Sequence, residues 1–196
     1  SRSIASASRE VCQGEILQTQ RRFDLTLTKK DYFNIIGMKT GALFAAATEL
    51  SAYISGVSPE VRAAMKDFGM KLGTAYQIYD DCLDLVGTEE QFGKTLRTDL
   101  EKGKLTLPML YLLEEAGDTQ REILQKRIIQ QEELDLTVLA GIAEYQGAIA
   151  RSLQYATDLL QEARDSLSLV NPSAYRDALA EMLDFLLTLL GSLQKA

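Results

Sequence analysis

Polar side chains share one side of an otherwise apolar helix between residues 77 and 86. Four residues form this polar side: Gln77, Asp80, Asp81 and Asp84. At about 100° per residue they fall within an arc of roughly 100°, whereas apolar residues fill the opposite side. Like charges three or four residues apart cost about 0.2–0.5 kcal/mol per pair, and no Lys or Arg lies within a turn. The segment therefore predicts a helix whose acidic side needs a compensating partner.

The acids also lie at the unfavourable end of this helix. Val86-Gly87-Thr88 predicts a C-terminal stop, where the helix dipole disfavours acids by roughly 0.3–1 kcal/mol. A divalent cation with oxygen ligands would remove both penalties, and Mg²⁺ commonly combines one or two protein carboxylates with substrate phosphates. On spacing alone, a solvated acidic face is the simpler interpretation, because the chain is rich in acids.

Two Gly-Lys pairs follow the acids. Phe92-Gly93-Lys94-Thr95 precedes Asp99, and Gly103-Lys104 comes next. Glycine lets the backbone approach a ligand closely, and a Lys ammonium suits phosphate oxygens. Each pair alone is ordinary loop chemistry, and neither belongs to a Walker A loop because the G-x-x-x-x-G-K-[ST] frame is missing. Their order after the acids indicates an alternation of carboxylate, metal, diphosphate and lysine.

In these segments the chain resembles the trans-type isoprenyl diphosphate synthases, also called the polyprenyl synthetase family. The matching segments are Gln77 to Asp84, Gly93-Lys94, Asp99-Leu100 and Gly103-Lys104 to Pro108. Members of this family carry two aspartate-rich motifs on facing helices of an all-α bundle, and this segment resembles the second motif.

The resemblance implies a role for each polar residue of the two segments. It implies that Mg²⁺ is bound by Asp80, Asp81 and Asp84. It also places Gln77 beside the reacting allylic carbon, and it places Lys94 and Lys104 near the allylic diphosphate.

Residues 32–44 are similar to the Lys-Thr helix of the same family. The resemblance implies that Lys39 binds diphosphate and that Thr40 faces the carbocation. Residues 11–15 resemble the preceding helix of the family, whose polar residues point into the active-site cavity, and we assign no individual role there.

The chain departs from the family pattern at its start. No other cluster has the spacing of the first aspartate motif, and the nearest candidate, Glu132-Glu133-Leu134-Asp135, lies far downstream. The N-terminal basic region that holds isopentenyl diphosphate in this family is also missing. The resemblance runs from about Ser6 to the C-terminus and corresponds to the later part of a family member, so we expect a C-terminal fragment that lacks the N-terminal helices and is inactive alone.

Composition excludes several classes of function. The 196 residues are 46% hydrophobic, which predicts that residues 1–196 form a single helical unit, either a whole domain or a large part of a domain. A formal charge of −7 argues against sequence-independent nucleic-acid binding. The absence of histidine removes His-based triads and His-metal sites. Cys12 and Cys82 form no disulfide framework, which favours a reducing cytoplasm, and residues 182–190 are too short an apolar run to span a bilayer.

Helical periodicity recurs along the chain, and it predicts an all-α antiparallel bundle. The expected spans after the N-terminal helical segment are 29–55, 59–86, 108–116, 120–130, 134–145, 148–167 and 173–194. Thr28 with Asp31 can cap the helix from residue 29, and Ser58 with Pro59 can begin the next.

The first two long helices should bring their polar residues to one level. Lys39 and Gln77 each lie 19 residues from the Ser58 cap, so at 1.5 Å per residue both stand about 28 Å from the turn. Two consecutive helices joined by a short turn pack antiparallel. We therefore expect Lys39 and the acids to face one cavity, and this expectation does not depend on the resemblance.

The resemblance implies a prenyl transfer: Mg²⁺ and lysines hold an allylic diphosphate, its C–O bond ionises, isopentenyl diphosphate attacks the cation, and a proton then leaves. Two alternatives stay open, a terpenoid cyclase of the same fold and a non-catalytic helical subunit that regulates a complete synthase. The Gly-Lys pairs argue against the cyclase. Family members are commonly homodimers, so we also expect a homodimer.

Overall fold

A computed structural model describes residues 1–87, 98–132, 134 and 136–194 of the chain. These residues form helices and no strand, so the predicted all-α class is confirmed. Lys94 and its Gly93 neighbour lie outside the described residues.

Two groups of helices can be distinguished in chain order. The long helices and their connecting turn are α1 (Arg2–Gln20), α2 (Lys29–Ile36), the π-helical turn η1 (Gly37–Gly41), α3 (Ala42–Ile54), α4 (Pro59–Val86), α10 (Gln146–Leu167) and α11 (Ala174–Leu193). The short helices are α6 (Thr98–Glu101), α7 (Leu107–Glu115), α8 (Asp118–Gln130) and α9 (Leu136–Ile142). Helix α9 is shorter than expected, and α10 begins two residues before its expected start.

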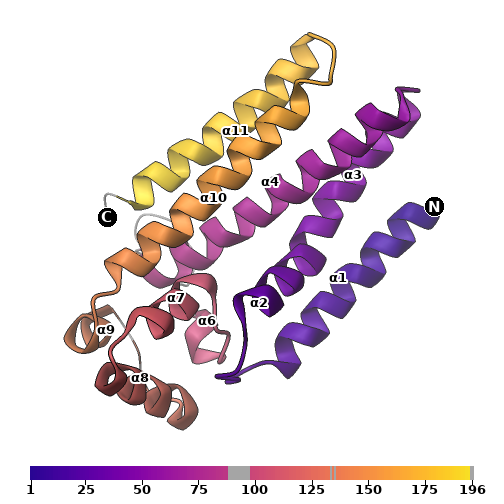
Figure 1. Cartoon of the computed structure of the whole chain (residues 1–196). Coiled ribbons are helices and arrows are strands. Elements are labelled where there is room, and N and C mark those ends of the chain that lie inside the picture. The colour runs from indigo at the N-terminus through magenta and orange to yellow at the C-terminus, as the bar shows by residue number, and fades with distance from the viewer. Residues whose placement is uncertain (88–97, 133, 135, 195–196) are drawn as a thin grey trace.

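Helix α4 lies at the centre of the bundle (Figure 1). It packs against α3 on one side and against α10 on the other, while α1 covers α3 and η1, and α11 covers α10. The short helices gather at the end of the bundle where α4 finishes. Because α4 is covered on both sides, its core residues Phe68 and Ile78 are fully buried.

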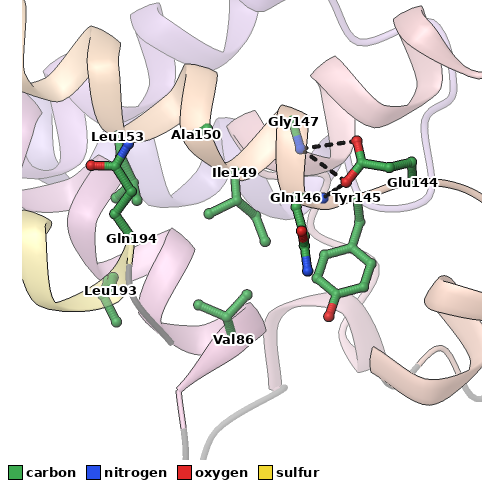
Figure 2. A pocket seen from close by; sticks show the side chains of 10 residues that line it. All are labelled: Val86, Glu144, Tyr145, Gln146, Gly147, Ile149, Ala150, Leu153, Leu193 and Gln194. Atoms are coloured by element: carbon green, nitrogen blue, oxygen red, sulfur yellow. Dashed lines mark hydrogen bonds between the residues drawn. The ribbon is translucent and has the colours of Figure 1, made fainter.

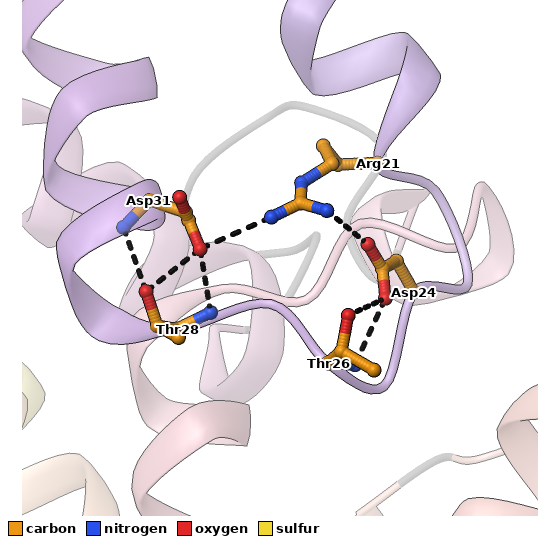
Figure 3. Close-up of polar contacts among 5 residues, drawn as sticks. All are labelled: Arg21, Asp24, Thr26, Thr28 and Asp31. Carbon is orange, nitrogen blue, oxygen red and sulfur yellow. Dashed lines mark hydrogen bonds and ion pairs between the residues drawn. The ribbon is translucent and has the colours of Figure 1, made fainter.

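The start of α2 is held by a compact group of polar side chains (Figure 3). Thr28 Oγ1 accepts from the Asp31 backbone N–H, and Asp31 accepts from the Thr28 N–H, each at 3.1 Å. This is a capping box, so the predicted cap is confirmed. Arg21 donates to Asp24 at 2.6 Å and to Asp31 at 3.1 Å, which ties the end of α1 to the start of α2.

The predicted boundaries of α4 are confirmed as well. Ser58 Oγ accepts from the Val61 N–H, and Pro59 occupies the first turn, where a missing N–H costs nothing. Gly87 ends the helix in an extended conformation.

The helical run from Lys29 to Ile54 is continuous, as expected, but it contains a feature that the periodicity did not predict. Residues Gly37–Gly41 form a π-helical turn, and Lys39 and Thr40 lie within it. A π turn contains one more residue than an α turn and is frequently found at functional sites.

Glycine allows α3 and α4 to approach each other closely. A Cβ added at Gly69 would lie 2.3 Å from Thr48 Oγ1 and 2.5 Å from the carbonyl oxygen of Phe44. A Cβ added at Gly73 would lie 3.0 Å from the Cα of Gly41. The two helices are therefore in backbone contact directly below the turn that carries Lys39.

Ionic and cation–π contacts hold α7 between α2 and α10. The Lys29 ammonium lies 4.9 Å from the ring centroid of Tyr111, and the Arg151 guanidinium lies 4.2 Å from it. Lys29 also pairs with Glu114 at 2.7 Å. Arg121 of α8 donates to the carbonyl oxygens of Leu113, Glu114 and Ala116, which caps the end of α7.

No helix in the described part of the chain combines the length and the apolarity that a membrane span requires.

We expect Gly69→Ala to lower the free energy of unfolding by about 1–3 kcal/mol, because the added methyl group meets the Phe44 backbone, which has no room to move. Gly191→Ala in α11 is the matched control. No heavy atom lies within 4 Å of its added Cβ, so we expect it to raise the free energy of unfolding by about 0.5–1 kcal/mol. Urea unfolding followed by circular dichroism measures both, and a Gly69→Ala chain as stable as the parent would contradict the close packing.

Candidate functional site

Thr40 and Gln77 meet where α4 passes the π turn. Thr40 Oγ1 donates to Gln77 Oε1 at 2.7 Å, although the two residues are 37 positions apart. The predicted alignment of the two helices is therefore confirmed at this level. The turn at Ser58 brings them together because α3 and α4 run antiparallel at backbone contact.

Asp81 lies beside Gln77, deep in the core. Its carboxylate is 2% exposed and accepts two hydrogen bonds, from Gln77 Nε2 at 2.9 Å and from the Tyr32 hydroxyl at 2.6 Å. Tyr32 comes from α2 and is itself 2% exposed. The solvated acidic face is thus excluded for this residue.

Burial raises the pKa of Asp81 to about 7. The positive charge of Lys39 opposes this shift, the negative charge of Asp99 adds to it, and the hydrogen bonds from Tyr32 and Gln77 oppose it. The pKa of Tyr32 is raised well above its ordinary value, first by burial and then by the charge of Asp81. Tyr32 consequently keeps its hydroxyl proton and donates it in the hydrogen bond to Asp81.

Asp84 lies one turn further along α4 and is 8% exposed. One of its carboxylate oxygens accepts from the backbone N–H of Asp99 at 3.1 Å, at the start of α6. This contact ties the end of α4 to the segment that carries Lys104.

Lys104 is paired with Asp99. Its ammonium lies 2.7 Å from Asp99 Oδ1, and both side chains are mostly buried. Burial alone would lower the pKa of Lys104, but the hydrogen bond and the charge of Asp99 outweigh it and raise that pKa above its ordinary value. Lys104 therefore stays charged.

The turn before Lys104 has a backbone that few residues can adopt. Gly103 has φ +73°, and a Cβ there would lie 2.5 Å from the ring of Phe23. The Phe23 N–H donates to the Gly103 carbonyl oxygen at 2.8 Å. Only glycine satisfies both the left-handed φ and the contact with the ring, so the second Gly-Lys pair has a structural reason at its glycine.

Lys39 is held by α1. Its ammonium donates to Gln18 Oε1 at 3.2 Å, and a Cβ at Gly14 would lie 2.6 Å from the Lys39 backbone nitrogen. Helix α1 therefore contacts the π turn directly. Gly14 belongs to residues 11–15, the segment to which the resemblance assigned no individual role.

Asp80 is half-buried and is the most accessible of the three aspartates. Among the described residues, no group of three or more Asp, Glu, Cys or His side chains is arranged to hold a metal ion. Asp81 and Asp84 turn instead toward Tyr32, Gln77 and the backbone of Asp99. The structure thus gathers Lys39, Thr40, Gln77 and the aspartates around the π turn and the last turns of α4, and it does not bring the three carboxylates together as one ligand cage.

The sequence did not single out Tyr32, Gln18 or Asp99 as site residues. Tyr32 and Asp99 stand within the segments that carry the resemblance, but nothing in their spacing predicted that one would donate to Asp81 and the other to Asp84. Gln18 offered no signal, because its contact with Lys39 depends on how α1 lies against the turn.

A separate cavity of about 600 Å³ lies at the end of α4 (Figure 2), and neither Thr40 nor Gln77 lines it. It is bounded by the start of α10, by the end of α11 and by Val86. Glu144 accepts from the backbone N–H groups of Gln146 and Gly147 at its rim. The cavity contains none of the predicted site residues.

The site combines two cationic side chains with a hydroxyl, an amide and several carboxylates. Lys39 and Lys104 provide charge for an anion, and the aspartates provide hard oxygen ligands. Thr40 and Gln77 provide oriented dipoles from packed helices. The set suits a phosphorylated ligand with a divalent cation, and because the sequence contains no histidine it offers no His-based catalysis.

Comparison with known proteins places this arrangement in a family. The chain matches the family model described as polyprenyl synthetase over residues 2–145. It is 36% identical over 178 residues to the short chain isoprenyl diphosphate synthase of Methanothermobacter thermautotrophicus, a match that covers 91% of this chain and 55% of that protein. The chain therefore spans about half the length of the curated relatives it matches.

Solved structures agree. A decaprenyl diphosphate synthase from Rhodobacter capsulatus superposes with a TM-score of 0.86 at 29% identity, over 95% of this chain and 58% of that chain. A polyprenyl synthase from Caulobacter crescentus CB15, complexed with calcium and isoprenyl diphosphate, superposes with a TM-score of 0.86 at 35% identity over the same shares. The fold is that of the all-α isoprenoid synthases, and the chain belongs to the polyprenyl synthetase family.

Proposed function

We propose that this chain forms the diphosphate-binding part of a prenyltransferase, which condenses isopentenyl diphosphate with an allylic diphosphate to make a longer polyprenyl diphosphate. The observation that carries the proposal is the hydrogen-bonded series Thr40–Gln77–Asp81, with Lys39 beside it in the π turn. The family resemblance pointed to the same residues, and the hydrogen bonds between them support it. Their convergence from two helices supports a shared task.

We propose Mg²⁺ as the cofactor, held by Asp80, Asp81 and Asp84. Carboxylate oxygens suit this ion, and Mg²⁺ usually takes only one or two protein carboxylates and completes its shell with water and phosphate. The three aspartates would therefore supply only part of the Mg²⁺ ligands. Asp81 and Asp84 can then also accept hydrogen bonds from the protein. The calcium in the complex of the Caulobacter relative supports a hard divalent cation here. When bound, Mg²⁺ would neutralise charge on the leaving diphosphate.

The chain's own residues would bind and orient the substrate. Lys39, Lys94 and Lys104 would neutralise the diphosphate oxygens. The oxygens of Thr40 and Gln77 would face the carbon that becomes cationic, held in place because both side chains are already hydrogen-bonded to each other. Such preorganised dipoles need no rearrangement when charge develops.

We also propose that residues 1–196 belong to one domain of a cytoplasmic homodimer. The two described cysteines are free thiols, which fits a reducing compartment. Exposed apolar side chains on α11, Tyr175 and Phe185, provide surface for association.

Calorimetric titration of geranylgeranyl diphosphate tests the diphosphate site. We expect Mg²⁺ to tighten the Kd at least about tenfold, and we expect Asp80→Asn and Asp84→Asn each to weaken Mg²⁺-dependent binding at least about tenfold, or about 1.4 kcal/mol. Asp165→Asn is the control, because Asp165 is an exposed acid on α10. Equal affinity with and without Mg²⁺ in the folded parent chain would contradict the metal site and favour a regulatory subunit.

The buried carboxyl of Asp81 gives the metal-free chain a specific pH dependence. Its pKa is about 7 in the folded chain and near the ordinary 3.8 when unfolded, so between these values the folded chain holds a proton that the unfolded chain releases. Stability from this group is therefore present below about pH 4 and is lost as the pH rises to about 7. Relative to Asp81→Asn, we expect the free energy of unfolding of the parent to fall by about 2–4 kcal/mol over this window. Parallel curves for the two chains, measured by urea unfolding in EDTA, would contradict the raised pKa.

Sedimentation equilibrium tests the homodimer. We expect a mass of twice the chain mass of 21.7 kDa at micromolar concentration. A mass of 21.7 kDa under these conditions would contradict association of this chain with itself.

A further inference from the structure

The hydrogen bonds around Asp81 extend further than the pair that faces the proposed substrate. They form an unbroken series from α2 to the π turn: the Tyr32 hydroxyl donates to Asp81 Oδ2 at 2.6 Å, Gln77 Nε2 donates to Asp81 Oδ1 at 2.9 Å, and the Thr40 hydroxyl donates to Gln77 Oε1 at 2.7 Å. Tyr32 is at its buried end and Thr40 is at its half-buried end.

The direction of every bond in this series is determined by Asp81. In this series Asp81 accepts on both of its oxygens, as an ionised carboxylate does, and it donates to neither partner. Gln77 must therefore turn its NH₂ group toward Asp81, and this turns its oxygen toward Thr40. Since an amide oxygen also cannot donate, Thr40 must give its single hydroxyl proton to Gln77. What remains on the Thr40 hydroxyl is acceptor capacity alone.

This direction has a chemical consequence. A Thr40 hydroxyl that has used its proton offers lone pairs, which stabilise a positive charge, whereas the opposite direction would offer a proton, which destabilises one. An amide has two polar ends of nearly equal size, so Gln77 alone sets no direction. The carboxylate sets it, and it does so only while its oxygen stays within hydrogen-bond distance of Gln77 Nε2.

Tyr32 holds the carboxylate in this position. It occupies the second carboxylate oxygen, so Asp81 has one donor on each oxygen. The ring of Tyr32 is buried in the core and packs edge-on against Phe33 with centroids 5.3 Å apart. Without the hydroxyl, the Asp81 carboxylate would lose one of its two hydrogen-bond donors and could rotate away from Gln77.

We propose that Tyr32 is a positioning residue, which acts through Asp81 to hold Gln77 and Thr40 with their oxygen lone pairs available to a carbocation. Tyr32 would contact neither substrate nor metal ion. The role in the reaction rests on the proposed prenyl transfer, whereas the role in orienting Gln77 does not.

Tyr32→Phe removes only the hydroxyl, and Tyr111→Phe is the control because Tyr111 is also buried but lies on α7. The first measurement is the side-chain amide signal of Gln77 in ¹⁵N-glutamine-labelled chain at pH 8.5, assigned by its loss in Gln77→Leu. We expect Tyr32→Phe to shift this signal and to speed hydrogen exchange of the NH₂ group about tenfold or more. An unchanged Gln77 signal in Tyr32→Phe would overturn the proposal, whether or not the protein is an enzyme.

Steady-state kinetics of prenyl transfer, measured on the full-length protein because the chain alone is expected to be inactive, then tests the consequence. We expect Tyr32→Phe to lower kcat about 10–100-fold with both KM values changed less than about twofold. We expect the double variant Tyr32→Phe/Thr40→Val to be no slower than Thr40→Val, within about threefold, because Tyr32 acts through Thr40. A parent-like kcat in Tyr32→Phe, or effects that multiply in the double variant, would overturn it. A full-length parent protein without transferase activity would instead contradict the proposed function, while the Gln77 signal still decides the orientation.

Discussion

A buried carboxylate determines the arrangement of the site. Asp81 lies in the central helix of the bundle, where an unpaired charge would cost several kcal/mol. It is tolerated because donors from two directions meet it, Tyr32 from α2 and Gln77 from its own helix. Helix α2 must therefore lie at a fixed height along α4, which in turn fixes the height of the π turn.

Close backbone packing makes this arrangement rigid. Glycines in α4 and at the end of the π turn let α3 and α4 touch, and Gly14 lets α1 touch Lys39. Side chains on three helices thereby reach one another with short hydrogen bonds and little freedom. Dipoles that are already oriented can stabilise a developing charge without the free-energy cost of reorienting them during the reaction.

Much of the fold followed from local rules. Caps at Thr28 and Ser58 and the stop at Gly87 marked helix boundaries correctly, because capping depends on neighbouring residues only. Equal distances from the Ser58 turn correctly brought the π turn to the level of Gln77. The inward turn of Asp81 and Asp84 was not predictable, because their partners Tyr32 and the Asp99 backbone are distant in sequence. The family motifs identified the aspartates as candidate metal ligands, but they did not identify the groups that donate hydrogen bonds to Asp81 and Asp84.

The π turn decides which residues of one helix can reach α4 together. In a regular α-helix, residues seven apart share a face, so Tyr32 would be aligned with Lys39, and Thr40 would point about 80° away. One extra residue in the turn moves the coincidence by one position, so that Tyr32 and Thr40 face α4 together and both meet it. Tyr32 and Thr40 are eight residues apart, and the extra residue of the π turn lets them share a face as residues seven apart do in a regular α-helix. Deleting a single residue between 37 and 41 would rotate α2 by about 100° relative to α3, and Asp81 would then lose its tyrosine or Gln77 its threonine. The number of residues in the π turn therefore determines whether Tyr32 and Thr40 can both reach α4.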